Sequence, residues 1–271
     1  MNLSDLIRSH ITDPNVGIGQ LALECALFEY PDLDINEEVL SFQSLSKAIE
    51  GRVSECETAL AKVNTLSEYL FDEVEFRGNT DNYYDPRNSF INDVLDRRLG
   101  IPISLSIVYV EVASRLGLEC VPIGAPGHLI LKINIEDGTT YFIDPFNKGI
   151  VMSEPESIEF LQRKVGLSYD LDQLTFDPIN KHDLILRLFT NIKYIYLRNS
   201  DYEKAYKVLD LLVDIDPHNV FEQRDRGIVG LRVGMQEQSL RDFRSFLKIH
   251  PVGRSAVEIS GFIEMLEKTI E

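Results

Sequence analysis

Cysteine is scarce in this chain of 271 residues. The three cysteines, Cys25, Cys56 and Cys120, are widely spaced among apolar neighbours, so neither a disulfide framework nor a zinc-binding pattern emerges. Free cysteines of this kind behave as small hydrophobic residues. We therefore expect all three to be structural residues of the core.

Long apolar runs and a basic leader are also missing. No apolar segment approaches the roughly 18 residues that a membrane span needs, and no basic stretch leads into an apolar run at the N-terminus. Secretion and membrane insertion are therefore not expected. The sequence predicts a soluble, cytoplasmic protein.

Basic residues are too few to balance the acidic ones. The chain holds 27 Lys+Arg and 44 Asp+Glu, which gives a formal net charge of -17 and an isoelectric point near 4.7. A field of this sign repels phosphate backbones and anionic membrane surfaces, so no nucleic-acid or membrane partner is expected. The 44% hydrophobic content suffices for one large domain or two modest ones.

Apolar residues recur at helical spacing through most of the first 78 residues. The pattern predicts a helix over 18–30 and either one long helix or two consecutive helices over 36–64. A further helix is expected to start at Thr65 and to stop before Gly78. A polar loop over 79–88 and a short helix over 90–99 follow.

A second pattern change lies after residue 100. Pro102 suits the first turn of a helix, and the segment from there to Gly117 is apolar on most sides, which predicts a buried helix. Short apolar runs over 120–123, 129–135 and 141–143 then indicate strands, with Asp137-Gly138 as a hairpin turn. Helices followed by strands predict an α+β fold with an antiparallel sheet behind the buried helix.

Four regions are expected along the chain. An N-terminal helical region covers 1–78, the α+β core covers 79–152, a connector covers 153–182 and helices fill 183–271. The connector is expected to turn at Glu154-Pro155 and at Asp177-Pro178.

The C-terminal helices carry a repeat. Pro217 and Pro251 lie 34 residues apart, each after an amphipathic segment, and this period matches the tetratricopeptide unit. The first unit fits well, whereas the second is degenerate at Arg226, Gly230 and Ser239. An ordinary helical hairpin with coincident prolines is the alternative. The residues expected to pack the repeat are Phe189, Tyr196, Ala205, Leu209, Pro217, Gly227, Phe243 and Pro251.

A histidine and an aspartate point to a possible reactive centre. His128 stands at the start of one predicted strand, and Asp144 lies 16 residues on, across the hairpin. Cysteine-nucleophile enzymes place a thiolate at a helix N-terminus, a histidine that takes its proton and an acid that orients the imidazole. The sequence supplies the histidine and the acid, and the alternative is a buried pair that holds two strands together.

Several motifs in order resemble the SirB family. They are Tyr84-Asp85-Pro86-Arg87-Asn88-Ser89, Asn92, Val94-Leu95, Arg97-Arg98, Gly100-Ile101-Pro102-Ile103-Ser104-Leu105-Ser106, Arg115-Leu116-Gly117, Pro126-Gly127-His128 and Ile143-Asp144-Pro145-Phe146. This bacterial family, named from a locus linked to invasion-gene regulation, is similar to transglutaminases in its core and carries a tetratricopeptide-like tail. The resemblance covers about residues 20 to 250 and implies a transglutaminase-like, papain-like core.

The resemblance also gives the missing nucleophile a position. In related transglutaminase-like proteins a Gly-x-Cys motif opens the buried helix, and the matching position here is Pro102, while His128 and Asp144 match the family's histidine and aspartate. Proline has no thiol, so thiol catalysis at that position is impossible. Ser104 and Ser106 are alternative nucleophiles, although serines in a first helical turn more often satisfy free backbone N–H groups.

Two functions follow. The first is a non-catalytic pseudoenzyme, regulatory in role, that binds an unknown protein partner through its repeat. The second is a hydrolase or acyltransferase that uses Ser104 or Ser106 with His128 and Asp144. No cofactor is expected, and no metal site either, because the other histidines are scattered. Arg97 and Arg98 are expected to pair with Asp93 or Glu111, and the alternative is that they present a carboxylate-binding fork.

Overall fold

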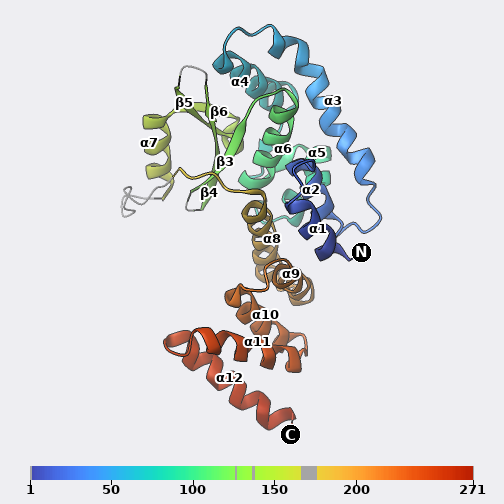
Figure 1. Ribbon diagram of the computed structural model, residues 1–271, viewed down its shortest axis with the longest axis vertical. Coiled ribbons are helices and arrows are strands. Elements are labelled where there is room, and N and C mark those ends of the chain that lie inside the picture. The colour runs from blue at the N-terminus through green and yellow to red at the C-terminus, as the bar shows by residue number, and fades with distance from the viewer. Residues whose placement is uncertain (1, 126, 136–137, 166–175, 271) are drawn as a thin grey trace. The chain divides into compact units, whose positions relative to one another are not determined.

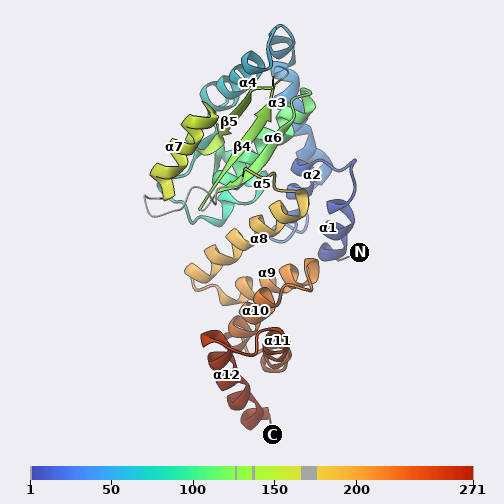
Figure 2. The same ribbon diagram turned by 60° about the vertical axis from the view of Figure 1, so that its left-hand side comes forward.

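The computed structural model describes residues 2–125, 127–135, 138–165 and 176–270. It divides into two compact units: Ser9–Leu188, called here the core unit, and Met1–Arg8 together with Phe189–Glu271, called the repeat unit. Figures 1 and 2 show the elements of each unit. The α+β fold class expected from the sequence is confirmed.

Helices form the first part of the core unit. Helix α1 (Leu3–Ile11) begins in the repeat unit and ends in the core unit. It is followed by α2 (Ile18–Ala26), α3 (Ile35–Ser54), α4 (Ala59–Glu68) and a π-helical turn, η1 (Tyr69–Glu73). Asp34 accepts backbone N–H groups at the start of α3, and Thr58 accepts the Ala61 N–H at the start of α4.

The helix expected to start at Thr65 begins earlier. Thr58 supplies the N-cap, so Thr65 falls inside α4, and the π-helical turn carries the chain on to Glu73. The expectation of two consecutive helices over 36–64 matches α3 and the first part of α4.

The buried helix is α6 (Pro102–Arg115). It is preceded by β1 (Arg77–Gly78), η2 (Pro86–Asn88), α5 (Ile91–Arg97) and β2 (Leu99–Gly100), and β1 pairs with β2 in parallel. Eleven of its fourteen residues are buried, as expected for a helix without a broad polar face. It packs against α2, α3, β3 and β4.

Four antiparallel strands form a sheet in the order β3-β4-β5-β6. They are β3 (Cys120–Ala125), β4 (His128–Asn134), β5 (Thr140–Asp144) and β6 (Ile150–Ser153), with η3 (Pro145–Asn147) between the last two. Helix α6 lies on one face of the sheet and α7 (Glu154–Val165) on the other (Figure 1). Gly138, at the predicted hairpin, has φ +85°, whereas Asp137 and Pro126 lie outside the described residues.

The predicted turn at Glu154-Pro155 is wrong, because α7 starts there. Proline is tolerated in a first helical turn, where its missing N–H has no helical partner. Glu156 Oε2 accepts both the backbone N–H and the hydroxyl of Ser153, at 2.8 and 2.6 Å, and this closes the helix start. At the second expected turn, Pro178 forms a bridge with Ile123 and Ile179 N–H donates to Pro122 O at the sheet edge.

Helices make up the repeat unit. They are α8 (Lys181–Arg198), whose first turns belong to the core unit, α9 (Tyr202–Ile215), α10 (Val220–Arg232), α11 (Gln236–Ile249) and α12 (Arg254–Ile270). Pro217 follows α9 and Pro251 follows α11. Of the expected packing residues, Phe189, Tyr196, Ala205, Leu209 and Phe243 are buried.

The degenerate positions of the second unit have structural partners. Arg226, where an apolar residue was expected, lies in a buried ion pair with Asp242 at 2.7 Å and also reaches Asp210. A Cβ on Gly230 would meet Ser239 Oγ at 2.5 Å, so these two small residues match each other. A Cβ on Gly227 would stand 2.6 Å from the Phe243 ring, which explains the glycine there.

Candidate functional site

The centre of the site is a histidine paired with an aspartate. His128 is the first residue of β4 and Asp144 is the last residue of β5. Leu131 pairs with Ile143, and because side chains alternate along a strand, this register places the His128 and Asp144 side chains on the same face of the hairpin. His128 Nε2 lies 2.8 Å from Asp144 Oδ2, and both residues are buried. The hairpin therefore joins two residues that are 16 positions apart.

Asp144 accepts several hydrogen bonds. Its Oδ1 accepts the N–H groups of Phe146 and Asn147 at 3.0 and 3.2 Å, and its Oδ2 accepts the Asn147 side-chain amide at 2.6 Å. Burial alone would raise the pKa of this carboxyl, but the bond and charge of His128, with help from Asn147 and Lys164, hold that pKa below its ordinary value. Asp144 is therefore an ionised acceptor that orients the imidazole.

Two aromatic rings lie next to the imidazole, and cationic side chains lie nearby. The His128 ring lies 6.3 Å from the Phe146 ring and 5.8 Å from the Phe160 ring, centroid to centroid. Lys164 Nζ stands 5.5 and 5.3 Å from the same two rings. Arg187 Nη2 donates to His128 O at 2.8 Å, and burial lowers the pKa of Arg187.

Sequence reasoning missed four of these neighbours. Asn147 follows Asp144 by three residues in Asp-Pro-Phe-Asn, a capping pattern that could have revealed it. Phe160 and Lys164 come from α7 and Arg187 comes from α8. No local signal exists for these three, because only the packing of helices on the sheet brings them to His128.

Pro102 is the first residue of α6 and is buried. The helix that it opens packs against β4 and η3, the elements that flank the His128 and Asp144 pair. The proline ring has neither an acidic proton nor a nucleophilic lone pair. The N-terminus of α6 therefore offers backbone N–H groups but no thiol.

Ser104 is committed to the backbone. Its hydroxyl donates to Asn88 O at 2.5 Å and accepts the Ile101 N–H at 3.0 Å, which ties η2 to the start of α6. Ser106 is buried one half-turn later, and its hydroxyl has no hydrogen-bond partner among the residues that the structure describes. Among the described residues, neither hydroxyl is bonded to His128, whose side chain pairs with Asp144.

The cysteines have the surroundings of core residues. Cys25 and Cys120 are buried, and burial raises the pKa of Cys25 well above its ordinary value and that of Cys120 to about 12. Cys56 is half-buried, and its thiol contacts Arg52 O and the Thr65 hydroxyl. Both buried thiols are protonated at neutral pH and are poor nucleophiles.

The predicted partners of the two arginines are wrong. Arg97 Nη2 lies 3.1 Å from Asp85 Oδ2, an acid that Arg87 also contacts. Glu111 instead pairs with Arg115 and accepts the Gly19 N–H, while Asp93 accepts the Tyr30 hydroxyl. Arg98 donates to Leu95 O and Asp96 O. Helix α5 turns these side chains toward different neighbours than sequence spacing suggested.

The comparison with protein families agrees with this architecture. Residues 38–190 match the transglutaminase-like superfamily, and residues 192–264 match the tetratricopeptide repeat. The chain belongs to the transglutaminase-like superfamily. Within this superfamily the resemblance to the SirB family is confirmed, because one of the relatives is a SirB1 protein.

The relatives span most of the chain. A UPF0162 protein of Xylella fastidiosa (strain Temecula1) is 30% identical over 256 residues, which are 93% of this chain and 91% of the relative. The UPF0162 protein YchA of Escherichia coli K12 is 27% identical, and Protein SirB1 of Salmonella typhimurium is 25% identical; each comparison covers 85% of this chain and 84% of the relative. No solved structure shows significant similarity to the chain.

Across the described ranges, no helix is long and apolar enough to cross a membrane. Within the same ranges, no three side chains of His, Cys, Asp or Glu are grouped as metal ligands would be.

Proposed function

We propose that this transglutaminase-like protein acts without covalent catalysis, as a scaffold that binds a partner protein through its repeat unit. The observation that carries the proposal is Pro102 at the first residue of α6. The helix N-terminus and the histidine and aspartate pair favour a thiolate, but the residue at the helix start cannot supply one.

The hydroxyls nearby do not replace the thiol in this proposal. The Ser104 hydroxyl donates its hydrogen bond to Asn88 O. Attack on a substrate would therefore first break this hydrogen bond, which holds the start of α6. Ser106 would need a base, and its hydroxyl has no hydrogen-bond partner within the described part of the chain. The His128 and Asp144 pair then acts to fix the end of the hairpin.

The repeat unit supplies surface for a partner. Tyr194 and Phe221 expose 58% and 50% of their surface, and the Arg224 guanidinium lies 5.6 Å from the Phe221 ring centroid. Aromatic side chains and arginine are enriched where proteins bind one another. Tetratricopeptide arrays present such surfaces on successive helices.

The test is purification of the full-length tagged chain from the organism that makes it, with partners quantified by mass spectrometry. We expect a reproducible partner whose recovery falls at least about tenfold with Tyr194→Ala plus Phe221→Ala, because exposed aromatic anchors dominate binding energy. The matched control is Ile150→Ala, an exposed apolar residue of the core unit (51% exposed), which should retain the partner. His128→Ala should retain it too, and loss of the partner with His128→Ala would contradict the proposal.

One observation keeps a hydrolase or acyltransferase as the second candidate. His128 Nε2 is hydrogen-bonded to Asp144, so Nδ1 is the imidazole nitrogen that could accept a proton from a nucleophile. A fluorophosphonate probe tests this candidate, since it labels activated serines. Labelling of the wild type that is lost with Ser106→Ala and with His128→Ala would favour the hydrolase or acyltransferase. We expect no labelling of the wild type.

A further inference from the structure

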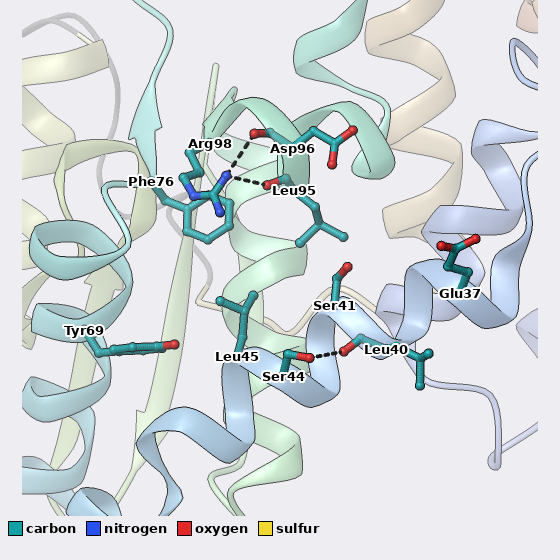
Figure 3. A pocket seen from close by; sticks show the side chains of 10 residues that line it. All are labelled: Glu37, Leu40, Ser41, Ser44, Leu45, Tyr69, Phe76, Leu95, Asp96 and Arg98. Carbon is teal, nitrogen blue, oxygen red and sulfur yellow. Dashed lines mark hydrogen bonds between the residues drawn. The ribbon is translucent and has the colours of Figure 1, made fainter.

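A cavity of about 530 Å³ opens in the core unit, away from His128. Helix α3 forms one wall, and the start of η1, the residue before β1 and the end of α5 form the others (Figure 3). Its lining residues are Glu37, Leu40, Ser41, Ser44, Leu45, Tyr69, Phe76, Leu95, Asp96 and Arg98. A volume of this order accommodates a ligand or a few side chains of another protein.

Four apolar side chains form part of the otherwise polar lining of the cavity, and one of them is exposed. Phe76 and Leu95 are buried, and Leu45 is half-buried beside them. Leu40 exposes 54% of its surface although it lines the same cavity. A leucine in that position is stabilised when a partner's apolar side chain covers it.

Carboxylates outnumber the lining cation, Arg98, at this cavity. Glu37 and Asp96 belong to its lining, and burial together with the charges of Asp96 and Glu37 raises the pKa of the neighbouring Glu38. In the part of the chain that the structure describes, none of these three carboxylates has an ion-pair partner. Their mutual repulsion is relieved when a cation binds beside them.

Arg98 does not neutralise this cluster. Its Nη1 donates to Leu95 O at 3.3 Å and to Asp96 O at 2.9 Å, so the guanidinium is held by carbonyls at the end of its own helix (Figure 3). The backbone of Arg98 is left-handed, with φ 56°. The side chain is thereby fixed at the cavity, where its other N–H groups can meet a carbonyl of a bound segment.

We infer that this cavity is a docking site for a short, basic, amphipathic segment of a partner protein. Basic side chains of the segment pair with Glu37, Glu38 and Asp96, and its apolar side chains cover Leu40 and reach Phe76. Charge complementarity favours this occupant over an anionic one. The core unit holds 30 Asp+Glu and 14 Lys+Arg, whereas the repeat unit is nearly balanced, with 14 and 13.

The inference goes beyond the proposed function, because this site lies in the core unit and the partner surface proposed above lies in the repeat unit. The two can fail separately. Loss of docking here leaves the effect of Tyr194→Ala plus Phe221→Ala on partner recovery intact.

The absence of tryptophan from the chain provides the assay. The probe is an amidated peptide of Lys and Leu, about 15 residues long, with helical spacing and a single Trp on its apolar face. Titration with the full chain should shift the peptide's emission to the blue and reach saturation. The same peptide with Glu in place of Lys should bind at least about tenfold more weakly, because its charges meet like charges.

Two pairs of variants locate the site. Glu37→Gln plus Asp96→Asn should weaken binding of the Lys peptide by up to about tenfold, the loss expected from two ion pairs between solvent-exposed side chains. Glu57→Gln plus Glu119→Gln removes the same charge from exposed residues outside the cavity and should change the affinity less than about twofold. Leu40→Ser should weaken binding, and Ile150→Ser, at similar exposure, should not.

Circular dichroism of each variant verifies that the chain is folded. An equal loss with both charge pairs would show general attraction to an acidic surface and would overturn the inference. So would the absence of a saturable emission shift with the wild type, or a Leu40→Ser affinity equal to that of the wild type.

Discussion

Asp144 Oδ2 lies 2.8 Å from His128 Nε2 and also accepts the Asn147 amide at 2.6 Å. A carboxylate whose pKa is held below its ordinary value only accepts hydrogen bonds, so His128 Nε2 donates to Asp144. Nδ1 is then the basic nitrogen, as in an enzyme with a nucleophile beside it. Here the helix that would present that nucleophile begins with Pro102.

The first prediction concerns stability at low pH. Because the pKa of Asp144 is lower in the folded chain than in the unfolded chain, its contribution is present above the unfolded-state value, about 3.9, and is lost as the pH falls toward the folded-state value. Asp144→Asn should lower the free energy of unfolding at pH 7 by about 2–4 kcal/mol, since it loses charge-assisted hydrogen bonds.

Urea unfolding at pH 7 and in steps below pH 5 measures this effect. The difference in the free energy of unfolding between the wild type and Asp144→Asn should decrease as the pH falls below about 4. Asp81→Asn, at an exposed aspartate, is the control and should change the free energy of unfolding by less than about 0.5 kcal/mol. A difference that increases with acidification would contradict the depressed pKa.

The second prediction places a thiol at the start of α6. Pro102→Cys, made together with Cys56→Ser to remove the half-buried thiol, should be alkylated by iodoacetamide at pH 7 faster than Cys25 and Cys120. The helix N-terminus and a nearby imidazole both lower the pKa of a thiol. Adding His128→Ala should slow alkylation about tenfold, since the base is removed. Mass spectrometry reads the modified residue, and a rate unaffected by His128→Ala would place the histidine out of reach.

The third prediction concerns the ion pair in the repeat unit. Arg226→Met leaves Asp242 buried without its partner and should lower the free energy of unfolding by about 3–5 kcal/mol. The double variant Arg226→Met plus Asp242→Leu removes both charges and should recover most of that loss. Thermal unfolding of the wild type, the two single variants and the double variant gives the coupling energy of the pair. Additive losses of the free energy of unfolding would show that the two residues are not coupled.

The fourth prediction contrasts two glycines. Gly227→Ala places a methyl group 2.6 Å from the Phe243 ring and should destabilise the chain by about 1–3 kcal/mol. Gly51→Ala, within α3, meets nothing within 4 Å and should stabilise it by about 0.5–1 kcal/mol through the gain in helix propensity. Guanidinium unfolding measures both changes. Equal effects would mean that Gly227 is not held by packing.

Local chemistry in the sequence determined much of this molecule. The apolar periodicity of 102–115 predicts a buried helix, the alternation of turns and short apolar runs predicts an antiparallel sheet, and two prolines 34 residues apart predict the repeat. These features depend on contacts within a few residues, so they can be read without knowing what packs on them. The presence of proline at position 102 is equally a fact of sequence.

Tertiary structure decided the rest. Glu154-Pro155 reads as a turn, but the packing of α7 on β5 and β6 makes it the start of a helix. The same packing brings Phe160 and Lys164 to His128. Likewise Arg97 finds Asp85, and the cavity beside Leu40 exists only where α3 meets the end of α5. Such contacts join residues far apart in the chain, and their energies depend on burial and geometry that local pattern does not contain.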